Sequence, residues 1–190
     1  MFATSISKEE LHQLPVGQFK GSIQLIESTI EVERVCSNLC YEPVLGFDTE
    51  SKPSFKKGNT NHVSLLQLAT SSNAYLFRLN KTGLPETLIK VLSNPKILKV
   101  GIAIRDDIRH LMALHQFKPD GFLELQAFVK QFGIENSGLS KLTGIILNFR
   151  ISKSQQLSNW ENEVLTQAQQ LYAATDAWAA YEIYETLIQL

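Results

Sequence analysis

Short apolar runs alternate with amphipathic stretches along the chain, a pattern typical of a sheet whose strands are separated by helices. In the strand-like runs apolar residues follow one another or alternate, whereas in the other stretches they recur at three- and four-residue spacing. Strands are predicted at 21–26, 44–50, 63–69, 74–79 and 97–102. Helices are predicted at 8–13, 28–40, 84–92, 106–115, 126–133, 139–147 and from about 163 to 190.

The order of these elements predicts one mixed sheet. A Ser-Ser-Asn turn joins the strands at 63–69 and 74–79, so these two and the strand at 44–50 are expected to be antiparallel neighbours. Further along, strands alternate with helices, which implies parallel strands that extend the same sheet. We therefore expect residues 21–190 to form a single α/β domain with a mixed sheet of five or six strands flanked by helices, and residues 1–20 to be peripheral.

The strand at 44–50, VLGFDTE, ends in two carboxylates, Asp48 and Glu50. Side chains on a strand repeat every two residues, so both carboxylates are expected on one face, about 6–7 Å apart along the strand. Two like charges at the end of an apolar strand repel each other and resist desolvation unless a cation lies between them. No Lys or Arg lies within the run, so a metal ion would stabilise it. The alternative is that the strand extends into water at Asp48.

Two more carboxylates are candidates for the same place. The apolar run 96–104 leads into Asp107 at the start of a helix, and in a parallel sheet its carboxyl end lies at the same edge as Asp48. An acidic residue in the first turn of a helix can equally serve the helix dipole alone. The last helix has an apolar face interrupted by Tyr172 and Asp176, and a carboxylate on such a face needs a partner. A hydrogen bond from Tyr172 would be enough for a purely structural role.

We call these four residues the carboxylate set: Asp48, Glu50, Asp107 and Asp176. Together they would supply hard oxygen ligands with neither sulphur nor imidazole. Ligands of this type select Mg²⁺ or Mn²⁺. Several anionic oxygens shared by two ions fit a two-metal site for phosphoryl transfer. The sequence thus predicts such a site if the fold brings the carboxylate set together.

Composition narrows the class of protein. The 190 residues, 44% hydrophobic and 19% charged, are typical of a globular domain, and the net charge of −1 lacks the basic excess of a protein that holds nucleic acid by charge alone. Cys36 and Cys40 are expected to be reduced thiols, because two cysteines four apart in a helical stretch are too few for a zinc site. The first residues indicate neither a signal peptide nor a membrane anchor, so we expect a cytoplasmic protein. We also expect no organic cofactor.

Three blocks of the sequence, FDTE, VGIAIRDDIRHL and LYAATDAWAAYEIY, resemble in this order the DEDD superfamily of 3′-to-5′ exonucleases, which has a ribonuclease H-like fold. Tyr172 followed by Asp176 is similar to the DEDDy branch, in which tyrosine takes the place of a histidine. SLLQL after the first block and SNW before the last resemble the Werner-type exonucleases, and the similarity spans about residues 44–190. Many relatives have an asparagine at the position of Ala103. Werner-type members lack this asparagine, as this chain does.

The resemblance implies that the carboxylate set binds two divalent metal ions, Mg²⁺ or Mn²⁺, while Tyr172 positions or deprotonates the attacking water. The second-block ligand is placed at Asp107 and not at Asp106, because the count from Gly101 and the match at Leu111 fit it better. The implied reaction is hydrolysis from the 3′ end of DNA, releasing 5′ mononucleotides. RNA 3′-end trimming and an inactive nucleic-acid-binding module are the alternatives.

Positive charge near the metal site would hold the nucleic-acid strand. The loop that follows the strand at 44–50 begins at the carboxylate end of that strand and is rich in lysine. Two apolar side chains are further candidates: Phe55 and Leu65 either wedge against the terminal base or belong to the core. No helicase or polymerase domain of the kind often fused to such exonucleases is present, so a stand-alone nuclease is expected. The candidate nucleic-acid contacts are Lys52, Phe55, Lys56, Lys57, Leu65, Arg105, Arg109, Arg150 and Lys153.

Overall fold

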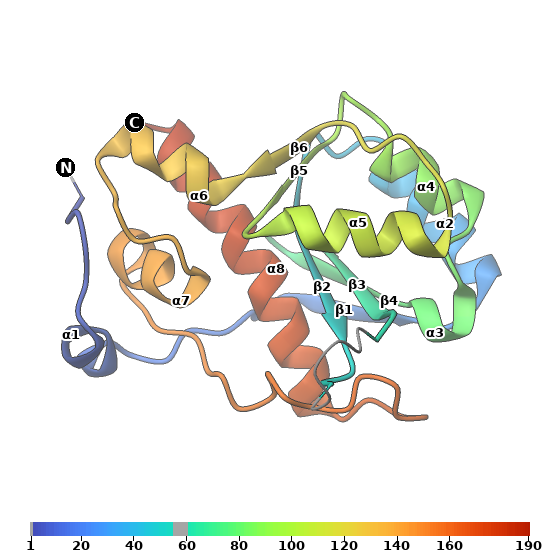
Figure 1. Cartoon of the computed structure of the whole chain (residues 1–190), viewed down its shortest axis with the longest axis horizontal. Coiled ribbons are helices and arrows are strands. Elements are labelled where there is room, and N and C mark those ends of the chain that lie inside the picture. The colour runs from blue at the N-terminus through green and yellow to red at the C-terminus, as the bar shows by residue number, and fades with distance from the viewer. Residues whose placement is uncertain (1, 55–60) are drawn as a thin grey trace.

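In the computed structural model, which describes residues 2–54 and 61–190, six strands form one mixed sheet at the centre of the molecule (Figure 1). The strand order across the sheet is β1-β4-β3-β2-β5-β6. The strands are β1 (Ser22–Ile26), β2 (Val44–Ser51), β3 (Val63–Ala69), β4 (Asn73–Arg78), β5 (Leu98–Gly101) and β6 (Phe122–Glu124).

The pairing within this sheet confirms the predicted α/β fold class. Strand β3 is antiparallel to both β2 and β4, as the turn between the predicted hairpin strands implied. Strands β5 and β6 extend the sheet in parallel beyond β2, and β1 pairs in parallel with β4 at the other edge. In the β2–β3 register Asp48 lies opposite Gln67 and Glu50 lies opposite Leu65, before a bulge between Glu50 and Ser51.

The helices follow the predicted order, with shifted ends. Strand β4 is followed by an extra short helix, and the last helix begins at Gln167 because Thr166 and Gln169 form its capping box. Within the described residues no helix has both the length and the apolar character that a membrane span requires. The helices are α1 (Lys8–Gln13), α2 (Thr29–Leu39), α3 (Leu79–Thr82), α4 (Glu86–Leu92), α5 (Ile104–Leu114), α6 (Leu125–Phe128), α7 (Leu139–Leu142) and α8 (Gln167–Ile188), with the 3₁₀-helix η1 (Val129–Phe132) after α6 and the π-helix η2 (Thr143–Leu147) after α7.

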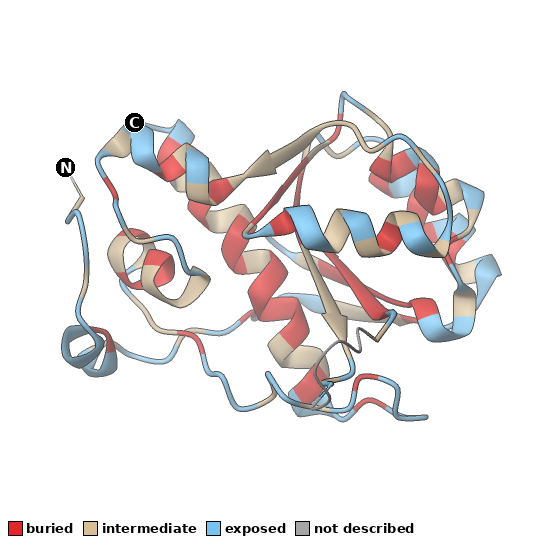
Figure 2. Ribbon diagram, viewed as in Figure 1, coloured by how far each residue is buried: buried red, intermediate tan, exposed pale blue. Residues whose placement is uncertain are grey.

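Buried residues are concentrated in the sheet and in α8 (Figure 2). Each face of the sheet has its own hydrophobic core. On one face, Phe47 and Leu66 pack with residues of α2, α4 and α5. On the other, Leu65 and Leu76 pack with alanines of α8 and with Trp160, which is fully buried. Because successive residues of a strand point to opposite faces, β2 directs Phe47 and Thr49 toward α5 and directs Asp48 and Glu50 toward α8.

Candidate active site

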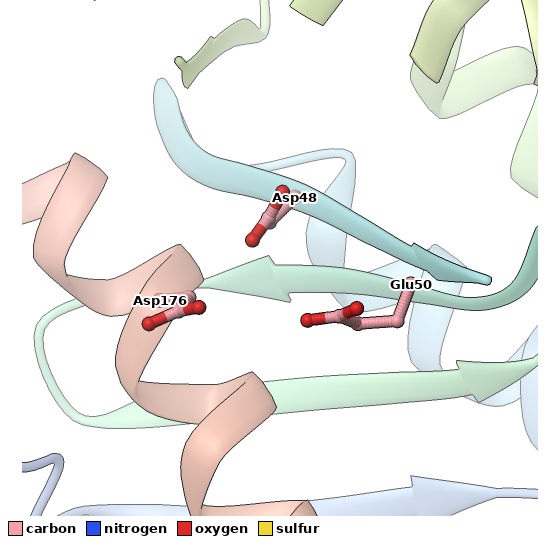
Figure 3. A group of neighbouring side chains, drawn as sticks. All are labelled: Asp48, Glu50 and Asp176. Atoms are coloured by element: carbon pink, nitrogen blue, oxygen red, sulfur yellow. The ribbon is translucent and has the colours of Figure 1, made fainter. Parts of the chain in front are cut away.

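The close approach of α8 to β2 brings Asp176 to the two carboxylates of the strand. Gly46 lies on the same face of β2 as Asp48 and Glu50, and a Cβ atom there would be 1.9 Å from the carbonyl oxygen of Ala177. The backbone of α8 therefore rests directly on the strand. As a result, oxygen atoms of Asp48, Glu50 and Asp176 lie within 4.8 Å of one another, with the side chains pointing toward a common space (Figure 3).

These three carboxylates fit a divalent metal ion. Asp176 is only 6% exposed, and its Oδ1 atom has no hydrogen-bond partner among the described residues. A buried anionic oxygen without a partner is unfavourable unless a cation is present. Three carboxylates gathered around one space are the donor set that Mg²⁺ or Mn²⁺ prefers.

Burial raises the pKa values of all three carboxylates, and repulsion from neighbouring carboxylates adds to the shift at Asp48 and Glu50. Burial, followed by the charges of Asp176 and Asp107, raises the pKa of Glu50 to about 8. Burial raises the pKa of Asp176 to about 7, although a hydrogen bond from Tyr172 and the charge of Lys153 oppose the shift. The pKa of the third carboxylate, at Asp48, is also raised well above its usual range, chiefly by burial. The metal-free site therefore retains protons near neutral pH, and a bound cation would displace them.

Asp107 lies beside this group and not within it. It belongs to the first turn of α5, and the hydroxyl of Thr49 donates a hydrogen bond of 2.5 Å to its Oδ1 atom. The charge of Asp107 is near enough to raise the pKa values of Asp48 and Glu50. The four members of the carboxylate set are thus neighbours, but Asp107 approaches from the α5 side of the sheet, held by Thr49.

Glu124, at the end of β6, holds the beginning of α5 and was missed in the sequence. Its carboxylate accepts hydrogen bonds from the backbone nitrogens of Ala103, at 3.0 Å, and Ile104, at 2.9 Å. Ala103 has a φ of 58°, in the left-handed region, so the turn from β5 into α5 needs such support. The only signal for Glu124 in the sequence was a carboxylate after a short apolar run that was not predicted as a strand.

Tyr172 and several polar residues line a pocket of about 460 Å³ that contains the three carboxylates. Tyr172 donates a hydrogen bond to Asp176, and its ring lies 6.0 Å from that of Trp160. Burial and the surrounding carboxylates raise the pKa of Tyr172, so its hydroxyl stays protonated. The pocket is also lined by Ser140 and Lys141, which the sequence did not single out because they lie within an ordinary helical pattern.

The predicted basic contacts differ in their surroundings. Lys153 lines the pocket, and its charge lowers the pKa of Asp176. Arg150 lines an adjoining cavity. Arg105 is exposed on α5, and Arg109 on the same helix forms an ion pair of 3.3 Å with Asp106.

The remaining predicted contacts come from β3 and from the loop after β2. Of the two alternatives for Leu65, a contact with the terminal base or a place in the core, the structure supports the core, because its side chain is fully buried under α8. Lys52 forms an ion pair of 3.3 Å with Glu161. The other three predicted contacts, Phe55, Lys56 and Lys57, lie outside the described residues.

Comparisons with known proteins agree with this arrangement. Residues 23–190 match the family described as 3′-5′ exonuclease. The chain is 34% identical over 184 residues to the mouse bifunctional 3′-5′ exonuclease/ATP-dependent helicase WRN, and 30% identical over 204 residues to the exonuclease mut-7 homolog of Aedes aegypti. These matches cover 92% and 94% of this chain but only 13% and 28% of the two relatives.

A solved structure shows the same fold. The crystal structure of the Aedes aegypti Nibbler EXO domain superposes with a TM-score of 0.81 at 27% sequence identity. The superposition covers 92% of each chain, so the sheet and the helices that position the pocket are common to both.

Proposed function

The chain belongs to the family of 3′-5′ exonucleases, and from this premise we propose that it hydrolyses DNA stepwise from the 3′ end with the help of two divalent metal ions. The observation that supports this most is the group of Asp48, Glu50 and Asp176, with its unpartnered buried oxygen, in one pocket with Tyr172. The choice of DNA depends on the similarity to WRN, and RNA is the alternative.

The carboxylate set would hold the metal ions. Asp48, Glu50 and Asp176 offer oxygens around one space, and Asp107 adds a fourth carboxylate from α5. Bound Mg²⁺ or Mn²⁺ would neutralise charge on the phosphoryl oxygens and make the attacking water more acidic. Lys153, at the wall of the pocket, would add positive charge beside the scissile phosphate.

Tyr172 would orient the attacking water. Its single hydroxyl proton is donated to Asp176, so its oxygen remains free to accept a hydrogen bond from water. Its raised pKa disfavours loss of that proton and therefore a role as the base. Of the two roles that the family resemblance implied, we propose the positioning one.

The proposed reaction is a single displacement at phosphorus. The oxygen of water attacks the terminal phosphodiester, and the bond from phosphorus to the 3′ oxygen of the preceding sugar breaks. That 3′ oxygen takes up a proton and becomes the new 3′ hydroxyl end. The other product is a 5′ mononucleotide.

Digestion of 5′-labelled single-stranded DNA, recessed-3′ duplex DNA and RNA tests this proposal. With Mg²⁺ or Mn²⁺ we expect a ladder that shortens from the 3′ end, and none with EDTA. Asp48→Ala should abolish the ladder. Asp106→Asn should leave it intact, because Asp106 is exposed and pairs with Arg109. Internal cuts, or undiminished digestion by Asp48→Ala, would contradict the assignment. If RNA is digested faster than DNA, the substrate is RNA and not DNA.

A further inference from the structure

A second cavity, of about 260 Å³, adjoins the active-site pocket. Ser140, Ile151 and Lys153 line both, so the two form one continuous depression. The pocket itself has room for little more than the nucleotide being removed, so the rest of a substrate strand has to leave it along the surface. The second cavity offers one such way out.

This second cavity is basic. Besides the three shared residues it is lined by Lys8, Leu11 and His12 of α1 and by Arg150, and no Asp or Glu is among its described lining residues. We call Lys8, His12, Arg150 and Lys153 the basic groove. None of them is in an ion pair with another residue in the described part of the chain, and the buried Nε atom of Arg150 has no hydrogen-bond partner there.

Helix α1 is fixed in place beside the groove. The backbone nitrogen of Arg150 donates to the carbonyl of Pro15, and that of Gly17 donates to the carbonyl of Arg150, both at 2.9 Å. Leu11 packs closely against Gly144: a Cβ atom added to Gly144 would lie 2.6 Å from the Cδ1 atom of Leu11. The segment expected to be peripheral therefore presents Lys8 and His12 in a defined position, although it precedes the residues matched by the exonuclease family.

We infer that the basic groove binds the sugar–phosphate backbone of the substrate strand on the 5′ side of the terminal nucleotide. The inference rests on the proposed function, because cleavage at the carboxylates fixes which part of the strand lies in the groove. A chain with a net charge of −1 has to hold a polyanion through local positive charge. Lys8, Arg150 and Lys153 adjoin the pocket and form no ion pair within the described residues, in contrast to Lys52 and Arg109.

Salt-dependent binding of a single strand tests the groove. The probe is a 5′-fluorescein single-stranded oligonucleotide of about twelve nucleotides, followed by anisotropy in EDTA over a series of KCl concentrations. Lys8→Glu reverses one charge at the first residue of α1, where an acidic residue suits the helix dipole, so folding is retained. The matched control is Lys118→Glu, an exposed position in the loop after α5.

We expect Lys8→Glu to weaken binding roughly 3- to 10-fold at low salt and to reduce the salt slope by about 0.7 for each phosphate that the variant no longer neutralises. Lys118→Glu should change neither. With metal present, Lys8→Glu should raise the KM for the long strand but not for a dinucleotide, which is too short to reach the groove. A merely structural role would affect both substrates alike.

The two proposals fail in different ways. If Lys8→Glu binds and digests the long strand as the wild type does, the groove is not the path of the strand, while the exonuclease assignment stands. If the wild type binds the strand but does not digest it with either Mg²⁺ or Mn²⁺, the exonuclease assignment is wrong. The anisotropy comparison needs no cleavage and still decides the groove.

Discussion

Glu50 and Asp176 are acids whose environment opposes their ionisation. Their pKa values of about 8 and about 7 lie well above the ordinary carboxylate range. Without metal, these two groups therefore bind more protons in the folded protein than in the unfolded chain from about pH 4 to about pH 8. Their contribution to the stability of the folded protein is greatest at the acid end of this window and falls as the pH rises through it.

We predict that the metal-free melting temperature falls between about pH 6 and about pH 8; above this range buried Lys99, whose pKa burial lowers to about 8, opposes the trend. Glu50→Gln removes one of the repelling charges and should raise the melting temperature at about pH 9 by about 2–4 °C. A shift of this size accompanies about 1 kcal/mol of stability in a chain of this length. The same variant should lose activity. Thermal unfolding in EDTA, with Glu161→Gln as an exposed control, provides the measurement. A melting temperature that rises with pH over this range would contradict the raised pKa values.

Tyr172 is expected to act on water and not on the metal ions. We predict that Tyr172→Phe lowers kcat by about 100-fold, because a misplaced nucleophile costs that order of rate. The rise in melting temperature produced by Mn²⁺ should persist, since Asp48, Glu50 and Asp176 are unchanged. Single-turnover digestion and thermal unfolding separate the two effects. Wild-type turnover by Tyr172→Phe would exclude the positioning role.

At the scale of the elements, Glu124 connects β6 to α5 and therefore to Asp107. We predict that Glu124→Ala destabilises the protein by about 1–2 kcal/mol, because two amide groups at the start of the helix lose their acceptor. Activity should fall as well, since Asp107 lies in that first turn. Glu86→Ala is the matched control, because Glu86 is in the first turn of α4 without capping it. Urea unfolding and digestion rates measure both.

The contact of α8 with β2 depends on Gly46. An added methyl group would collide with the backbone oxygen of Ala177, so we predict that Gly46→Ala moves α8 away from the strand and abolishes digestion. Gly138→Ala adds the same methyl group at the wall of the pocket, where nothing lies within 4 Å, and should be tolerated. If both variants digest DNA equally well, the spacing of β2 and α8 does not control the site.

At the scale of the whole molecule, Arg78 ties the segment between α7 and α8 to the sheet. Its guanidinium is fully buried and donates to the backbone carbonyls of Asn162 and Glu163 and to the carboxylate of Glu27. Trp160, in the same segment, is the residue that packs against the Tyr172 ring. Arg78 on β4 thus supports the pocket from two strands away in the sheet.

We predict that Arg78→Met destabilises the protein by about 2–3 kcal/mol, because these acceptors lose a charged donor. Lys81→Met should cost clearly less than Arg78→Met, although Lys81 contacts Glu27 and Glu163 too, because its ion pairs are more exposed. Urea unfolding distinguishes the two. Equal costs would mean that Arg78 contributes only a surface ion pair.

The parts of this molecule that were visible in the sequence are those with a repeating pattern. Strands and long helices follow periods of two and 3.6 residues, and the spacing of Asp48 and Glu50 predicted their common face. Strand β6 has three residues, too few for a period, so its Glu124 was missed. The pairing of Lys52 with Glu161, the burial of Leu65 and the docking of α1 depend on contacts between distant parts of the chain, which no local pattern records.

Gly46 also bears on how relatives of this chain are classified. A protein can carry every acidic residue and the tyrosine of the motif and still be catalytically silent, if the second residue before its first aspartate has a side chain and the helix opposite cannot retreat. If Gly46→Ala abolishes digestion, the residue at that position would help to tell active relatives from inactive ones when the motif does not. In this chain the position is a glycine, and the helix lies against it.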